Sequence, residues 1–517
     1  MKSCVTHPLP EYNYSGMLDL LGAAIFHFHP QLASSTIQVP CGFAIGHRLN
    51  RRFSGCTSIQ HCQMAPPQLL DLPVEILQAI CQQLCAHCTS GDFTPPERLE
   101  TGSPSLPDVS RPKNDTQALI ALSQTCRKLY PIARPVVYHE YVSEQWKTSH
   151  VAGFFRTILE RPDLAALVQR LSLASKDFEE PSSLSILGQL IRDNLVLPPG
   201  FDGKLYMANI DESREDCTIH NTWSELCVDL ILSTLPNMTQ LHLSILSYSP
   251  YGALLPQSPT LLSALKAIQL ETKGINGFHL ETCAGLLTKP ANLERLQLTL
   301  CTSIGRRLDL GTVRWLKLVD CMLFREHVHT LAESCPNLET FISHNRNAPL
   351  DDVNHCNPRA FAEGVLPCKD TLRHLEIHFV DRSAGQVVPN YSIVSLKEFG
   401  SLKTLILTGD CVGLLDASMI LHGTPGDQSE VAVSFVDLLP PSIETLIIEG
   451  NYTGLYNPLL ALASEVRNQK FPFLKTVKET RFDWKFPSHA VKPVKDAMEA
   501  SGVSFEISEE SAFCLQS

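Results

Sequence analysis

The sequence lacks both a long apolar run and an excess of positive charge. No stretch approaches the ~20 uncharged apolar residues that a membrane-spanning helix requires. The formal net charge is −12 at pH 7, from 42 lysines and arginines against 54 aspartates and glutamates. The basic residues are dispersed, without the interleaved aromatics of a nucleic-acid-binding surface. We therefore expect neither a membrane protein nor a nucleic-acid-binding protein.

The sequence also lacks the short motifs that carry common catalytic chemistry. It has no nucleophile-elbow glycine-serine-glycine pattern, no metalloprotease helix and no glycine-rich phosphate loop. Four histidines, His327, His329, His344 and His355, lie close together along the chain, and we interpret them as loop and surface residues. We expect no enzymatic activity, no catalytic residues and no cofactor.

The 18 cysteines lack the dense, regular spacing of a secreted disulfide scaffold. We expect reduced, mostly buried thiols, and hence a protein of the cytosol or nucleus. Cys81, Cys85 and Cys88, with His87 and Cys62 nearby, raise the question of zinc. No second Cys-x-x-Cys pair stands at finger-like spacing, so we expect buried thiols here and no metal.

The two ends of the chain share no pattern with the rest. Residues 1–63 have no repeat or helical periodicity, and the segment MAPPQLLDLP from Met64 resembles a natural protein start. We expect residues 1–63 to be disordered or not translated in the cell. Residues 508–517 form a short tail.

A short apolar helix is predicted in LLDLPVEILQAICQQL, residues 69–84. Pro73 suits the first helical position, where its missing N–H costs nothing. Ile76, Leu77, Ile80 and Leu84 then recur with a period near 3.6 residues. Because a helix of this length is unstable alone, its apolar stripe must be buried against something.

Two further helices are predicted after a proline-rich, polar interval at residues 87–116. The stretch ALIALSQTCRKLYPIARPVVYHEY, residues 118–141, carries an apolar stripe up to Tyr130 and, after Pro131, a third apolar patch. The interval itself is typical of an exposed, disordered insert. Residues 64–145 are therefore expected to form a small helical domain.

These helices together resemble an F-box, particularly the form common in filamentous fungi. The resemblance is carried by Leu72-Pro73 and Glu75-Ile76-Leu77 in the first helix and by the CRKLY, ARP and VY elements later. The family usually has only a few residues in place of the insert. An F-box docks on a SKP-family adaptor, which bridges to a cullin. The residues that this resemblance assigns to adaptor binding are Leu72, Pro73, Ile76, Leu77, Ile80, Leu84, Leu119, Leu122, Cys126, Tyr130, Ala133, Val137 and Tyr138. The alternative is a private bundle in which the same leucines fill the chain's own core.

One six-residue phrase recurs through the rest of the chain. An apolar residue, two variable ones, an apolar residue, a variable one and a final apolar residue describe a strand with one buried face. The copies are VQRLSL (from residue 168), MTQLHL (238), LKAIQL (265), LERLQL (293), VRWLKL (313), LETFIS (338), LRHLEI (372), LKTLIL (402), IETLII (443) and LKTVKE (474).

Helix-like runs that end at a proline or turn precede several of these strands. The strand-plus-helix unit resembles an irregular leucine-rich repeat of the kind found in F-box receptors. We predict an α/β fold in which a three-helix F-box-like domain precedes a repeat solenoid over residues 146–507, with parallel strands on the concave face and helices outside. A doubly wound α/β enzyme is the alternative; its glycine-rich phosphate turn is not found.

The variable positions of each phrase should line the concave face and bind a target protein. The candidates are Arg295, Gln297, Trp315, Lys317, His374 and Glu376. Trp315 beside basic residues has the composition of a binding hot spot, although it could instead pack under a neighbouring loop. The hypothesis is a substrate receptor of an SCF-type (SKP adaptor–cullin–F-box) ubiquitin ligase. The alternatives are a repeat scaffold whose helices only cap the array, and an unrecognised α/β enzyme.

Overall fold

The computed structural model describes two compact units of the chain. Residues 69–85, 88, 113–143, 148–174, 218–245, 251–252, 255, 262–272, 277–345, 357–379, 393, 395–408, 411, 435–449, 455–481 and 488–509 are described. The first unit ends at Val137 and the repeat unit runs from Tyr138.

The first unit is a small helical bundle. Its elements are η1 (Leu69–Asp71), α2 (Val74–Gln83), α4 (Lys113–Thr125) and α5 (Tyr130–Val137). They close around a core of Leu77, Cys81, Cys85, Leu119, Leu122, Leu129, Ala133 and Val136. The bundle therefore buries its own apolar stripe without any other chain.

Local chemistry explains where these helices begin. Pro73 directly precedes α2, one position earlier than the sequence predicted, with a φ of −54° that suits a proline ring. Leu77, Ile80 and Cys81, spaced i, i+3, i+4, turn inward together. The Lys128 ammonium donates a hydrogen bond to the carbonyl of Leu70, which holds the turn between α4 and α5 against η1.

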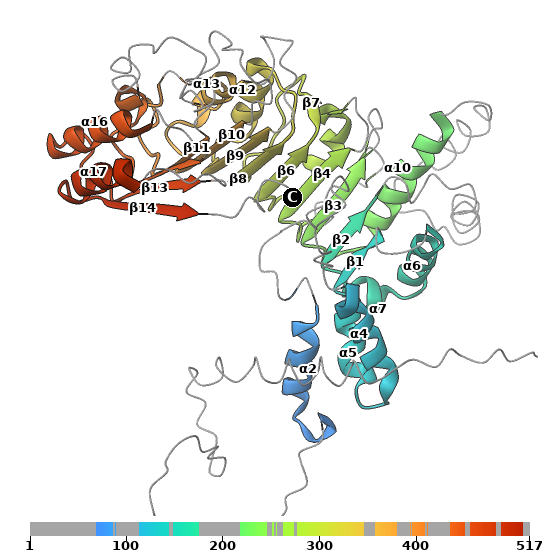
Figure 1. Ribbon diagram of the computed structural model, residues 1–517. Coiled ribbons are helices and arrows are strands. Elements are labelled where there is room, and N and C mark those ends of the chain that lie inside the picture. The colour runs from blue at the N-terminus through green and yellow to red at the C-terminus, as the bar shows by residue number, and fades with distance from the viewer. Residues whose placement is uncertain are drawn as a thin grey trace, which may run out of the picture. The chain divides into compact units, whose positions relative to one another are not determined.

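The repeat unit is built on one parallel sheet (Figure 1). Twelve strands pair in the order β1-β2-β3-β4-β6-β8-β9-β10-β11-β12-β13-β14. Their bounds are β1 (Glu140–Val142), β2 (Arg170–Leu173), β3 (Gln240–Ile245), β4 (Ala267–Thr272), β6 (Arg295–Thr299), β8 (Trp315–Val319), β9 (Thr340–Asn345), β10 (His374–Phe379), β11 (Thr404–Thr408), β12 (Thr445–Glu449), β13 (Thr476–Arg481) and β14 (Ser504–Glu509). A separate two-stranded sheet pairs β5 (Phe278–His279) with β7 (Cys301–Ser303).

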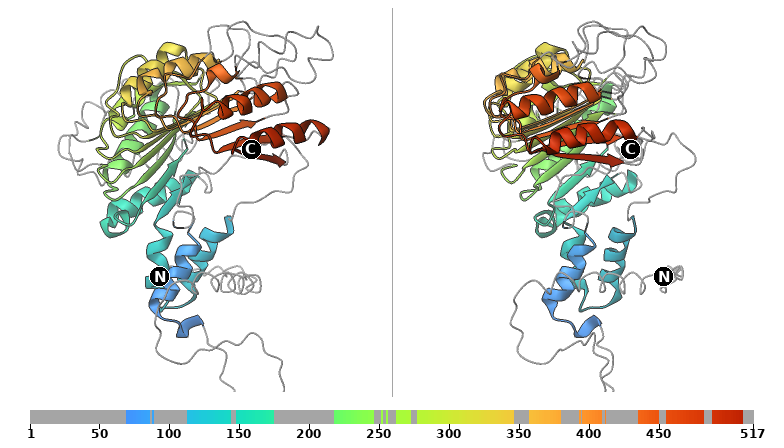
Figure 2. Two further views of the ribbon diagram at one scale, coloured as in Figure 1. Left: turned by 90° about the vertical axis from the view of Figure 1, so that its left-hand side faces the viewer. Right: turned by 60° about the vertical axis from the view of Figure 1, so that its left-hand side comes forward.

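Helices follow the outer face of this curved sheet (Figure 2). Their bounds are α6 (Thr148–Glu160), α7 (Pro162–Ala165), α10 (Thr218–Ser233), η4 (Leu280–Cys283), α11 (Ala284–Leu287), α12 (Arg325–Ser334), α13 (Pro358–Gly364), η5 (Leu366–Cys368), α16 (Tyr456–Arg467) and α17 (Ser488–Glu499). Inward-facing residues of α10, α12 and α13 share one continuous core with alternate residues of the strands. The other strand residues form the inner face of the sheet.

One hydrogen-bond pattern is repeated at the start of successive strands. The backbone N–H groups of Gln240 and of the residue before it both donate to the carbonyl of Gln169. The N–H groups of Thr340 and its predecessor likewise both donate to Arg314, and those of His374 and its predecessor to Glu339. Each repeat is thus held in constant register on the one before it.

Buried side chains add further bonds between neighbouring repeats. Asn345 Nδ2 donates to the carbonyl of Cys321 at 3.1 Å, and Cys411 Sγ donates to the carbonyl of Ile377 at 3.3 Å. Thr408 Oγ1 bonds both the N–H and the carbonyl of Phe379. These bonds satisfy backbone groups that would otherwise be buried without a partner.

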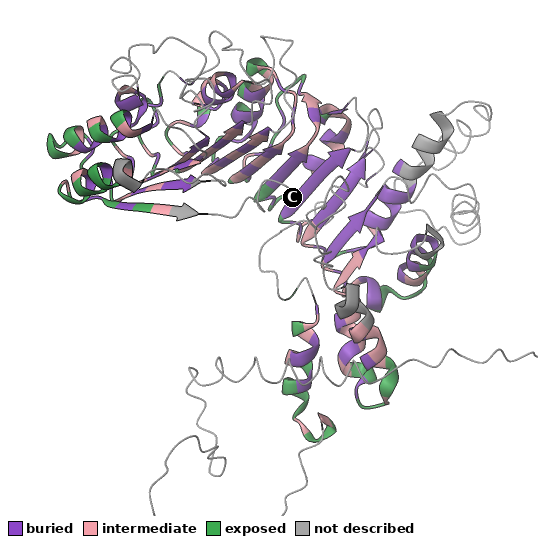
Figure 3. Cartoon of the chain, in the orientation of Figure 1, coloured by how far each residue is buried: buried purple, intermediate pink, exposed green. Residues whose placement is uncertain are grey.

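The inner face is covered over part of the sheet and open over the rest (Figure 3). All residues of β4 are buried, and so are those of β3 after Gln240. In β8 and β12, by contrast, every second residue is only half-buried. The accessible part of the inner face therefore lies on β8 to β12.

The structure confirms a mixed α/β fold with a long parallel sheet of the leucine-rich-repeat type. All ten predicted phrases form strands, each beginning two residues after the first apolar residue. One boundary differs: β1 pairs with β2 and yet lies inside residues 64–145, which the sequence assigned to the helical domain. A strand of three residues is too short to show a periodic pattern. Residues 1–63, and the insert at 87–116 apart from Cys88 and the first turn of α4, lie outside the described residues.

Among the described helices, none is both long and apolar enough to cross a membrane. All described cysteines are free thiols, and most of them are buried, as the sequence predicted.

The aromatic core of the repeat unit gives a first prediction. Phe361 is fully buried, with its ring centroid 5.6 Å from that of Phe379 and 6.3 Å from that of Phe341. Phe361→Ala should lower the free energy of unfolding by about 3–5 kcal/mol, because it leaves a cavity. Urea denaturation followed by circular dichroism measures this change. The control is Phe473→Ala, at a side chain that is 58 % exposed, where we expect a change within about 0.5 kcal/mol. Equal losses at the two positions would contradict the described packing.

Candidate functional sites

The inner face carries all six residues that the sequence assigned to target binding: Arg295, Gln297, Trp315, Lys317, His374 and Glu376. Arg295 on β6 pairs in register with Trp315 on β8, and Gln297 pairs with Lys317. His374 and Glu376 lie on β10, and β9 separates them from Trp315 and Lys317 on β8. The structure therefore places the set on one face, although Gln297 is 5 % exposed and so contributes little surface.

The most polar part of the open inner face surrounds Glu376. Its Oε1 lies 2.6 Å from His344 Nε2 and 3.0 Å from His378 Nε2. Its Oε2 lies 3.3 Å from His374 Nε2. His378 Nδ1 lies 3.0 Å from Glu449 Oε2, so two carboxylates flank one imidazole. The parallel register explains the convergence, since His344 on β9 is the direct neighbour of His378 on β10.

Electrostatics assign different charge states to these groups. Burial alone would raise the pKa of Glu376, but hydrogen bonds from three surrounding imidazoles lower it far below the usual range. Burial alone would lower the pKa of His378, but bonds to Glu376 and Glu449 raise it to about 9. Burial, with smaller effects of His378 and Lys317, lowers the pKa of His344 to about 4, although its hydrogen bond to Glu376 acts in the opposite direction. At neutral pH the cluster thus contains a carboxylate, an imidazolium and a neutral imidazole.

The structure corrects the interpretation of the neighbouring histidines as loop and surface residues. His344 lies on β9 with its side chain 22 % exposed. His327 and His329 lie on α12. Of these two, only His329 is exposed at the surface as predicted, with its Nε2 3.5 Å from Glu333 Oε1. His355 lies outside the described residues. The sequence could not show that His344 meets a carboxylate 32 positions away, because only strand pairing brings them together.

A second polar set is buried on the inner face of β2, β3 and β4. Ser172 Oγ lies 2.8 Å from His242 Nδ1, and His242 Nε2 lies 3.4 Å from Glu271 Oε2. A serine, a histidine and a carboxylate in series invite comparison with a catalytic triad. Ser172 is only 1 % exposed, however, so a substrate has no access to its hydroxyl. We interpret the set as a buried polar contact between three strands, in which only Ser172 and His242 are hydrogen-bonded to each other.

The residues assigned to adaptor binding are divided between the core and the surface of the first unit. Buried in the unit are Leu77, Ile80, Leu119, Leu122 and Ala133; half-buried are Leu72, Leu84, Cys126 and Val137; exposed are Pro73, Ile76 and Tyr130. Tyr138 begins the repeat unit. Four of the buried residues, Leu77, Leu119, Leu122 and Ala133, fill the core of their own bundle, which is what the alternative hypothesis expected of them. Docking on this unit must therefore use the exposed residues.

Two exposed apolar residues of this unit were not predicted from the sequence. Val74 is 52 % exposed and Leu70 is 37 % exposed, together with Ile76 at 37 % and Tyr130 at 45 %. We call these four residues the apolar patch. The Arg134 guanidinium lies over the Tyr130 ring, 5.2 Å from its centroid. The sequence does indicate such exposure, because this segment contains more apolar residues than one buried helical stripe can hold.

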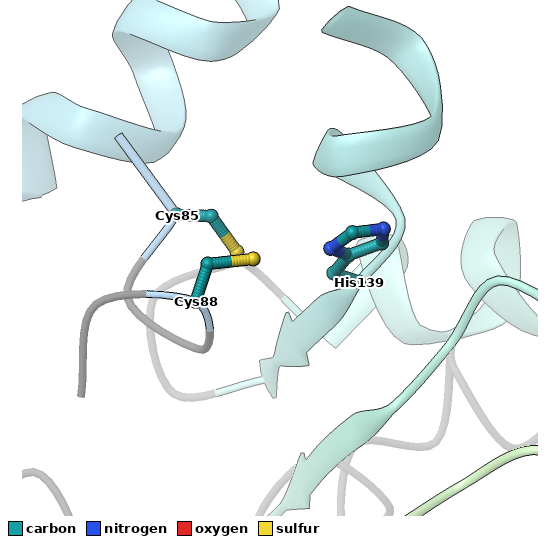
Figure 4. Close-up of side chains that lie close together, drawn as sticks. All are labelled: Cys85, Cys88 and His139. Carbon is teal, nitrogen blue, oxygen red and sulfur yellow. The ribbon is translucent and has the colours of Figure 1, made fainter. Parts of the chain in front are cut away.

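The Cys-x-x-Cys pair follows α2 closely. The side chains of Cys85 and Cys88 lie side by side, and the N–H of Cys88 donates to the carbonyl of Cys85 at 3.0 Å (Figure 4). Burial raises the pKa of the neighbouring Cys81 to about 11, which keeps it a neutral thiol and a poor metal ligand. His139, also drawn in Figure 4, belongs to the repeat unit, where its carbonyl accepts from the N–H of Arg170.

Comparison with known proteins identifies the repeats. Residues 306–492 match the family model described as a leucine-rich repeat domain. This segment contains strands β8 to β13 and thus the open inner face. Among curated proteins, none matches the chain in sequence. The chain therefore contains a leucine-rich-repeat region, which indicates a role in binding other proteins.

The division between core and patch gives a second prediction, from two adjacent residues of α2. Leu77 is 2 % exposed and Ile76 is 37 % exposed. Leu77→Ala should destabilise the first unit by about 2–5 kcal/mol, whereas Ile76→Ala should change stability by less than about 1 kcal/mol. Native-state hydrogen exchange of α4 and α5 amides reports this locally. A larger loss at Ile76 than at Leu77 would show that the helix faces the opposite way.

Proposed function

We propose that this chain is the substrate-recognition subunit of an SCF-type ubiquitin ligase and performs no chemistry itself. In this proposal the first unit docks on a SKP-family adaptor, and through it on a cullin. The open inner face of the repeat unit holds a target protein. The F-box resemblance supplies the partners, and the apolar patch is the observation that carries the proposal.

The apolar patch does not contribute to the core of the first unit, which other residues form. The described residues expose six large hydrophobic side chains strongly, and four of them, the apolar patch, belong to this small bundle. The bundle already has a closed core, so its exposed apolar residues are available to another surface. An excess of exposed apolar residues on a small helical unit is typical of a docking site.

The segments that carry the patch are tied together. The hydrogen bond from Lys128 to the Leu70 carbonyl fixes η1 against the turn that precedes α5. Leu70 lies in η1, and Tyr130 is the first residue of α5. The bond therefore links the segment that carries Leu70 to the segment that carries Tyr130.

The inner face suits a protein target of mixed charge. Trp315 and Lys317 are half-buried at one end of the open region, next to the exposed Arg295 on β6, while Glu376 and Glu449 lie towards the other end. Aromatic and arginine side chains supply much of the binding energy in protein interfaces. Opposite charges at the two ends would fix the orientation of the target.

Proximity would be the whole contribution of such a receptor to ubiquitin transfer. A target held on the array experiences an effective concentration of the ubiquitin-carrying enzyme on the order of millimolar when the connection is short. The lysine of the target and the charged enzyme then react without any catalytic group from this chain. The free thiols of the described cysteines suit the cytosol or nucleus, where we place this activity.

The third prediction tests the docking. The full-length chain should co-purify with a SKP-family adaptor. The double variant Val74→Asp, Ile76→Asp should weaken the complex by about 100-fold or more, because two charges then enter an apolar contact. The matched control is Leu460→Asp, at an equally exposed leucine of α16 in the repeat unit, which should leave the affinity unchanged. Surface plasmon resonance with immobilised adaptor measures all three proteins.

Two results would overturn the proposal. A folded chain that does not bind the adaptor would make the helical unit a cap and the chain a repeat scaffold. Binding that is lost equally in the Leu460→Asp variant would place the contact on the repeat unit. An α/β enzyme remains the other candidate, and the burial of Ser172 and His242 argues against their serving as its site.

A further inference from the structure

Three side chains on the inner face place metal-binding atoms close together. They are His344 on β9 and Glu376 and His378 on β10. One ligand atom from each lies within 4.8 Å of the other two. Glu376 Oε1 is central, at 2.6 Å from His344 Nε2 and 3.0 Å from His378 Nε2. Strand pairing, not chance proximity of loops, sets this arrangement.

The donor set fits a borderline-soft divalent ion. Two imidazole nitrogens and one carboxylate oxygen are common zinc ligands, at about 2.0–2.2 Å from the metal. Tetrahedral bonds of that length place the ligand atoms about 3.3 Å apart. The two short separations around Glu376 Oε1 therefore have to widen by less than about 1 Å. The third separation, between His344 Nε2 and His378 Nε2, would have to be brought to the same value from at most 4.8 Å.

Partners behind two of the three ligands already orient them. His378 Nδ1 is bonded to Glu449 Oε2 at 3.0 Å, which directs Nε2 towards Glu376 and His344. A carboxylate behind a ligating imidazole is a recurrent feature of zinc sites, where it fixes the tautomer and increases ligand basicity. His374 Nε2 bonds the other oxygen of Glu376, at 3.3 Å. These contacts from Glu449 and His374 distinguish the cluster from surface histidines that lie close together without fixed orientation.

Burial of the cluster is intermediate, which suits a site that keeps an open position. The side chains of the three residues are 16–22 % exposed. Water is thus largely excluded, while a group from a bound protein can still approach. Three protein ligands leave the fourth position of a tetrahedral ion free.

We propose that His344, Glu376 and His378 bind Zn²⁺ on the inner face of the repeat unit, with a fourth position open to water or to a side chain of a bound protein. The ion replaces two N–H groups that donate to Glu376. The proton on His378 Nε2 is released, and the neutral His344 ring carries its proton on Nδ1 so that Nε2 can bind the metal. Glu449 and His374 act as positioning residues. The site is independent of adaptor docking and stands whether or not the first unit binds a SKP-family adaptor.

The experiment uses the full-length, untagged chain with Cys88→Ser, because Cys88 is an exposed thiol that could itself bind metal. Titration with ZnCl₂ by isothermal calorimetry, after removal of bound metal, should show a site that depends on the three residues. His344→Gln and Glu376→Gln should each weaken binding by at least about 100-fold, and Glu449→Gln by about 10–100-fold. His329→Gln, on the outer helix α12, is the matched control and should bind as the parent does. Circular dichroism melting verifies that each variant is folded.

A parent chain that does not bind Zn²⁺, or ligand variants that bind as tightly as the parent, would overturn the proposal. Should the variants fail to fold, X-ray absorption at the zinc edge of the parent, loaded with one equivalent, decides the question. Two imidazoles among nitrogen and oxygen ligands at about 2.0–2.1 Å support the site. A shell without imidazole, or one dominated by sulfur, contradicts it.

Discussion

The backbone pairing of each repeat with the previous one is the constraint on which the rest of the structure depends. At the start of successive strands one carbonyl accepts two N–H groups from the next repeat, from His139 at one end to Glu444 near the other. Parallel strands locked in this way cannot shift by one residue without turning every core leucine outward. The same lock decides which side chains meet on the inner face. The strand register therefore determines both which leucines are buried and which polar side chains meet on the inner face.

Sequence periodicity predicted this register but not all of its consequences. The phrase from LERLQL to IETLII marks strands because its leucines, such as Leu296 and Leu316, recur with one buried face. It could not mark β1, which has only three residues, and it could not show that the inner face is covered at β3 and β4. Those features depend on contacts between segments that are distant along the chain.

The same distinction separates what was predictable at the candidate sites. The positions of Trp315 and Lys317 on the inner face follow from alternation alone. The meeting of His344 with Glu376 does not, because it requires the pairing of β9 with β10. In the first unit, periodicity identified the apolar residues of α2 but not the direction each faces. Leu77 closes the core, whereas Ile76 is left at the surface.

The two units thus present surfaces of different chemistry. The first unit has an apolar patch on a closed bundle, suited to a partner that buries it. The repeat unit has a polar inner face, in which Glu376 and Glu449 compensate the charge of His378. In the proposed function, this division of surfaces serves to hold two other proteins at once. Apolar docking gives a stable attachment, and the charged face gives selectivity.

Hydrogen–deuterium exchange of the full-length chain, with and without a SKP-family adaptor, tests this account most directly. We predict added protection confined to the peptides that contain η1, the start of α2 and the start of α5, with no change in strands β8 to β12. Protection on the inner-face strands, or none in the first unit at adaptor concentrations that saturate binding, would contradict it.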